Sequence, residues 1–180
     1  MKLFYLFLSL FALLLTACGA NSTPATNLPA NATGVTPGDF RITVSGDLTT
    51  QLTGQALAQS SSPASPDQSL TLVLFAAGAA DAPARGVTVV MPADIASGTY
   101  PIKSYYSVFD STGLVTGVGA LFSEPGSADN PANLFDASSG ELQLTSLNPV
   151  SGSLNFNTSS PEMTLTVEGV FNDVPLIAAP

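Results

Sequence analysis

A series of short apolar segments separated by turn residues limits the fold more than any other feature of this chain. Phe40, Ile42 and Val44 alternate with polar residues, as in a strand with one buried face. The run LTLVLFAA at 70–77 has the length and composition of a strand that is buried on both faces. No apolar stripe with a helical period is long enough for a substantial helix. The sequence therefore predicts an all-β fold.

Further strands are expected where apolar and polar residues alternate or apolar residues cluster: 87–91, 100–109, 115–122, 141–147, 154–156 and 163–171. Ser-Gly and Asn-Pro pairs mark turns between several of them. Short strands at turn-marked intervals are typical of an antiparallel β-sandwich, immunoglobulin-like or related, and we expect that fold. A small closed β-barrel is the alternative. The expected domain covers 39–176, and residues 177–180 form a tail.

The N-terminus has the parts of an export signal. Lys2 precedes an apolar run at 3–15 that only Ser9 interrupts, and small residues follow the run. A membrane span needs about 18 consecutive apolar residues, which is more than this run offers. We therefore expect residues 1–17 to be a signal peptide that is removed.

The segment Leu15-Thr16-Ala17-Cys18 resembles the lipobox of bacterial lipoproteins, and Cys18 is the only cysteine in the chain. The resemblance implies that the thiol receives a diacylglycerol group and that a peptidase cuts between Ala17 and Cys18. Two or more acyl chains give a stable membrane anchor. Gly19 is not the aspartate that tends to retain such proteins at the inner membrane. The resemblance thus implies the bacterial cell envelope, with the outer membrane or cell surface favoured.

Residues 18–38 are rich in Asn, Thr, Ala and Pro and lack apolar periodicity. Such a composition buries too little apolar surface to compensate for the entropy lost on ordering. We expect a flexible spacer that holds the folded part away from the membrane. The alternative is a loop packed on the domain.

The composition excludes several classes of function. Charged residues make up 9% of the chain, against about 25% in typical globular proteins. Once Lys2 is removed, thirteen acidic residues stand against three basic ones. This balance disfavours nucleic acid as a partner, since nucleic-acid sites need clustered Lys and Arg.

Catalytic constellations are equally scarce. The chain has no histidine, which removes Ser-His-Asp and Cys-His catalysis and the commonest metal ligand. A carboxylate pair of the glycosidase kind stays formally possible. We expect a protein that is not an enzyme and that needs no cofactor and no metal. Glu124, Asp129 and Asp136 are close in the sequence, and a calcium site there is left open, because calcium prefers oxygen ligands.

Aromatic residues gather around Lys103. Strand alternation would place Tyr100 and Tyr106 on one face of a strand and Tyr105 and Phe109 on the other. Packing within the sheet is the favoured interpretation. Tyr105 and Phe109 are the candidate binding residues if the outward set stacks on a sugar ring.

The C-terminal half resembles a group of small all-β domains of unknown function from bacterial, often Bacteroidetes-type, envelope lipoproteins. The likeness lies in SGTYPI at 97–102, in the hairpin at 139–156 and in a closing strand at 163–176. The usual tryptophan near the first strand of that group is missing here. The resemblance implies an all-β envelope lipoprotein and no catalytic residues.

These observations lead to a non-enzymatic, membrane-anchored envelope lipoprotein with an interaction or structural role. One alternative is a capture module for a glycan or peptide, acting through the face of Tyr105 and Phe109 or through the acidic loop. Another is a small barrel that carries an apolar ligand in its interior.

Overall fold

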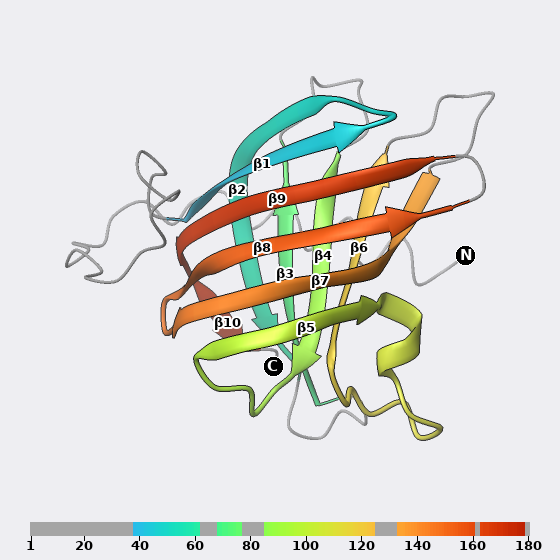
Figure 1. Ribbon diagram of the computed structural model, residues 1–180. Helices are drawn as coiled ribbons and strands as arrows, with labels where there is room; N and C mark the ends of the chain where they lie inside the picture. The colour runs from blue at the N-terminus through green and yellow to red at the C-terminus, as the bar shows by residue number, and fades with distance from the viewer. Residues whose placement is uncertain (1–37, 62–67, 77–84, 125–132, 161–162, 179–180) are drawn as a thin grey trace, which may run out of the picture.

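The computed structural model describes residues 38–61, 68–76, 85–124, 133–160 and 163–178 (Figure 1). The regular structure in these ranges consists of strands and one 3-10 helix, so the predicted all-β fold is confirmed. Its elements are β1 (Asp39–Gly46), β2 (Thr50–Ser60), β3 (Ser69–Phe75), β4 (Gly86–Pro92), β5 (Gly98–Ser104), η2 (Tyr105–Val108), β6 (Val118–Glu124), β7 (Asn133–Leu147), β8 (Val150–Ser159), β9 (Thr164–Val174) and β10 (Leu176–Ala178).

Several predictions of the sequence fall elsewhere in the chain. Ala17 and Cys18, the predicted cleavage and lipidation residues, lie outside the described residues, as do the predicted spacer up to residue 37 and Asp129. Within the described ranges, no helix is both long and apolar enough to cross a membrane.

The strands form one sheet that closes on itself. The order around the sheet is β1-β9-β8-β7-β5-β6-β4-β3-β2, and β2 pairs again with β1. Strand β7 also pairs directly with β6 beyond the end of β5, and β10 adds to β2. Pairing is antiparallel except between β5 and β6 and between β10 and β2. The molecule is therefore a nine-stranded β-barrel: the predicted sandwich is wrong, and the alternative of a small barrel is confirmed.

The barrel resembles two layers when it is viewed from one side. Strands β1, β9, β8, β7 and β5 run across the front of Figure 1, and β2, β3, β4 and β6 cross behind them. Strand β1 joins the layers, because it pairs with β9 over one edge and with β2 over the other. On the other side, β6 joins the layers by pairing with β5 and β7. Alternating apolar and polar residues suit a sandwich and a barrel equally, and these joining pairs distinguish the two.

The inward side chains of the strands fill the barrel. The largest fully buried ones include four phenylalanines, which are at most 1% exposed: Phe40, Phe122, Phe156 and Phe171. Leucines, valines and isoleucines from β1 to β9 complete one continuous apolar cluster. Small closed barrels are usually packed in this way. The described side chains thus occupy the space that an apolar ligand inside the barrel would need.

Two inward glycines on the front strands make room for the large rings. A Cβ atom on Gly140 would lie 2.5 Å from the Cβ of Phe156, on the neighbouring strand. A Cβ on Gly152 would lie 2.9 Å from the Cζ of Phe171. Glycines at such points let strongly curved strands close around a core.

Strand β5 ends earlier than the sequence pattern suggests. A strand was predicted over 100–109, but the chain turns into η2 after Ser104, so the prediction is wrong from Tyr105 onward. The carboxylate of Asp136, on β7, accepts hydrogen bonds from the Ser104 hydroxyl and, at 2.6 Å, from the Tyr105 N–H. Gly119 on β6 lets η2 lie close, because a Cβ there would come within 2.8 Å of the Tyr105 Cα.

The chain enters the barrel beside the end of β9. The Gly38 N–H donates to the Asn172 carbonyl at 2.6 Å, and the Gly38 carbonyl accepts from the Ala56 N–H at 2.8 Å. The predicted tail begins at residue 177, whereas β10 includes Leu176–Ala178 and pairs with the end of β2. Strand β10 thus extends the sheet where β2 runs past β1.

Candidate functional site

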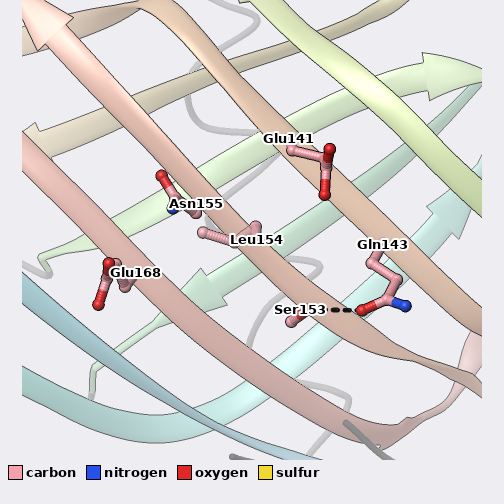
Figure 2. Close-up of a pocket in the computed structure, with 6 residues that line it drawn as sticks. All are labelled: Glu141, Gln143, Ser153, Leu154, Asn155 and Glu168. Carbon is pink, nitrogen blue, oxygen red and sulfur yellow. Dashed lines mark hydrogen bonds between the residues drawn. The ribbon is translucent and has the colours of Figure 1, made fainter.

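A hollow lies on the outer face of the barrel over the middle of β7, β8 and β9 (Figure 2). Its volume is about 220 Å³. Five of its six lining residues are polar, and the full set is Glu141, Gln143, Ser153, Leu154, Asn155 and Glu168. We call this set the β8 trough.

Strand alternation explains why these side chains face outward. Leu142 and Leu154 point into the barrel and are at most 3% exposed. Their chain neighbours on the same strands, Glu141 and Gln143 on β7 and Asn155 on β8, therefore point to the solvent side and are exposed. The positions are set by the apolar core, not by the polar residues themselves.

The trough has a floor and two walls because the three strands carry outward side chains of different length. Ser153 and Asn155, on the central strand β8, are short. The longer side chains of Glu141 and Glu168 stand on the strands to either side, and Figure 2 shows both beside Asn155. The register places Glu141 opposite Asn155 and Asn155 opposite Glu168, so the three form one row across the sheet.

Within the trough, hydrogen-bonding capacity is largely unused. The Ser153 hydroxyl donates to Oε1 of Gln143 at 3.4 Å, a long contact. Among the described residues, the side chains of Glu141, Asn155 and Glu168 make no hydrogen bond or ion pair. Two carboxylates and an amide thus face solvent side by side.

The predicted aromatic site takes a different form from the one expected. Tyr105 and Phe109 are half-buried, with ring centroids 5.6 Å apart and planes inclined by 59°. Tyr106 is 62% exposed, and its ring stands edge-on to that of Tyr105, at 80°. Tyr105 and Phe109 pack on a second small apolar cluster outside the barrel, formed by Val90, Val108 and Val115. The three rings are therefore not coplanar, and the contacts of Tyr105 and Phe109 with this cluster favour packing.

The described acidic residues of the predicted calcium loop have protein partners. Glu124 forms an ion pair with Arg85, with 2.5 Å between Oε1 and Nη2. Asp136 lies on β7 and holds the start of η2. Across the described ranges, no group of three or more His, Cys, Asp or Glu residues is placed to hold a metal ion.

Asp110 stabilises the turn after η2. Its Oδ1 accepts hydrogen bonds from the Thr112 hydroxyl at 2.7 Å, from the Thr112 N–H at 2.8 Å and from the Leu114 N–H at 3.0 Å. These bonds, above all the one from the Thr112 hydroxyl, hold the pKa of Asp110 below its ordinary value of 3.8. The role of this carboxylate is local and structural.

A scan against protein-family models, a search of curated proteins and a search of solved structures each found no match. The functional inference therefore depends on the residues and geometry of this chain.

Sequence reasoning missed the β8 trough. The signal was present in ELQ at 141–143 and SLN at 153–155, where polar residues alternate with buried leucines. Alternation alone indicates an exposed face, however. The hollow arises from long and short side chains placed side by side on three strands, and only the register reveals that.

Proposed function

We propose that this protein is a lipid-anchored protein of the bacterial cell envelope that acts through binding or structural contact and not through catalysis. The observation that carries the proposal is Cys18, the single cysteine of the chain, which directly follows Leu15-Thr16-Ala17 at the end of an apolar run. A diacylglycerol group on this thiol supplies the anchor. Gly19 at the next position favours the outer membrane or the cell surface over the inner membrane.

The length of chain between Cys18 and the first strand supports a tethered arrangement. Nineteen residues lie between Cys18 and Gly38, where the chain joins the sheet. At about 3.1 Å per residue for an extended segment, they span up to roughly 60 Å. A barrel on such a tether can meet partners well above the lipid surface.

The state of the acidic residues supports a non-enzymatic role. The chain has no histidine, and Asp110, Glu124 and Asp136 are engaged in structural contacts. Glycosidases place their two carboxylates on either side of a bound glycosidic bond. Glu141 and Glu168 instead stand on an open outer surface. Such a surface can bind a ligand, but it does not enclose a bond between the two carboxylates.

The all-β fold agrees with the fold of the small envelope-lipoprotein domains that the sequence resembles. We propose that the chain belongs with that group. The filled interior favours contact through the outer surface over the carriage of an apolar ligand.

The decisive experiment examines the mature N-terminus. We expect mass spectrometry of protein from bacterial membranes to show Cys18 as the first residue, carrying a diacylglycerol group. Cys18→Ser should abolish the lipid mass and move the protein out of the membrane fraction. Gly19→Ser is the matched control and should keep both the lipid and the membrane association. Membrane association that survives in Cys18→Ser protein from which residues 1–17 have been removed would contradict the proposal.

A further inference from the structure

We infer that the β8 trough binds a neutral, polyhydroxylated ligand, namely one sugar ring of a glycan chain. This inference rests on the proposed binding role and names its ligand class. The binding site inferred here is different from the one expected at Tyr105 and Phe109, whose rings pack against the small apolar cluster.

The chemistry of the central row fits ring hydroxyls. Adjacent strands lie about 4.8 Å apart, so the backbones of Glu141 and Glu168 are roughly 10 Å apart with Asn155 between them. Ionised carboxylates only accept hydrogen bonds, whereas the Asn155 amide both donates and accepts. Neighbouring hydroxyls of a sugar do both as well, and bonds to carboxylates are the stronger kind. A ring over Asn155 can therefore satisfy all three side chains.

Other ligand classes fit the trough less well. Two carboxylates repel an anion, and the polar lining gives an apolar ligand little to pack against. Calcium takes six to eight oxygen ligands, usually with several carboxylates close together. The trough supplies two carboxylates on strands that are not adjacent, and the described residues contain no group of three or more His, Cys, Asp or Glu placed to hold a metal ion.

The backbone that carries the trough is also fixed before any ligand arrives. Its side chains stand on β7, β8 and β9, and β8 is paired along both edges. The inward neighbours Leu142 and Leu154 are fixed in the core. Sites on strands are positioned more accurately than sites on loops, and less ordering entropy is lost on binding.

The size of the hollow sets the expected strength of binding. At about 220 Å³ it is smaller than the 300–1,000 Å³ pockets that enclose whole ligands, so we expect it to hold a single ring. With few contacts and no aromatic lining, a dissociation constant of about 1 mM is expected. Many copies anchored on one surface would raise the overall affinity through multivalency.

The test is an NMR titration of the full-length protein in detergent micelles, with chitohexaose, cellohexaose and maltohexaose as neutral probes and calcium chloride in a separate arm. We expect at least one sugar to shift the amide signals of the trough residues, and calcium to leave them unchanged. If no sugar shifts them, or if calcium shifts them and the sugars do not, the inference is wrong.

Variants locate the contact. The double variant Glu141→Gln/Glu168→Gln keeps shape and removes both charges, and it should weaken sugar binding about tenfold or more. Asn155→Leu should weaken it similarly. Thr53→Ala, at an exposed position on β2, is the matched control and should bind as the parent does. Equal binding by the double variant would overturn the inference. Because the mature N-terminus is analysed separately, loss of this site and loss of the anchor are distinguishable.

Discussion

The outer surface of the barrel has two regions in which outward side chains behave in opposite ways. Over β4 and β6, the outward Val90 and Gly119 are buried, because η2 and its aromatic rings lie on them. Over β7, β8 and β9, the outward Glu141, Asn155 and Glu168 are exposed, and no described segment covers them. The apolar and small residues on the outside of β4 and β6 are thus covered, whereas the polar row over β7, β8 and β9 remains available to water or to a ligand.

The largest expected effect comes from filling the covered region. Gly119→Val would push a side chain into the Tyr105 backbone and the Val108 side chain, and overpacking of this kind destabilises by about 1–3 kcal/mol. Asn155→Val, in the open trough, should change stability by no more than about 0.5 kcal/mol. Chemical denaturation measures the free energy of unfolding of both variants. Equal m-values would show that the variants and the parent expose the same surface on unfolding. Similar losses in the two variants would remove the distinction between the regions.

A loss no larger than the middle of that range is expected when the link between β7 and η2 is cut. Asp136→Ala removes the carboxylate that accepts two hydrogen bonds from the start of η2, and we expect a loss of about 2 kcal/mol. Hydrogen exchange at the Tyr105 amide should accelerate in this variant, which shows that η2 loosens locally. Glu141→Ala on the same strand has no such partners and is the control. An unchanged exchange rate at Tyr105 would show that packing alone holds η2.

The smallest effect concerns pH at the turn that follows η2. Because hydrogen bonds hold the pKa of Asp110 below 3.8, its ionised form stabilises the folded state above that value. The contribution is lost as the pH falls through the lower, folded-state pKa. NMR titration of the Asp110 carboxyl should give a midpoint below 3.8, and Thr112→Val should raise it. A midpoint at or above 3.8 in the parent would show that the Thr112 bonds do not form in solution.

The sequence predicted strands far better than it predicted their assembly. The alternation of Phe40, Ile42 and Val44 reports which face is buried, and all three are in the core. Closure depends on β1 pairing with β2 and β9 at once, which a local pattern does not encode. The change from β5 to η2 depends on Asp136, 31 residues from Tyr105 in the chain. Contacts over such distances in sequence lie beyond pattern reasoning.

The candidate sites follow the same division. Tyr105 and Phe109 were identified by residue type. Their ring angles and packing partners follow from η2 and the residue after it, which the strand pattern missed. The trough required knowledge of which residues sit opposite one another on three strands. Side-chain chemistry can be read from a sequence, whereas cross-strand neighbours cannot.

The pairing of β1 with β2 has a further consequence for the behaviour of the protein at high concentration. Unpaired strand edges attract strands from other molecules and promote aggregation. Each of the nine barrel strands pairs with a neighbour along both of its edges. Among the described strands, only β10, with three residues, has a free edge. High local concentration should therefore leave the molecules separate, and light scattering at increasing concentration can test for the absence of large assemblies.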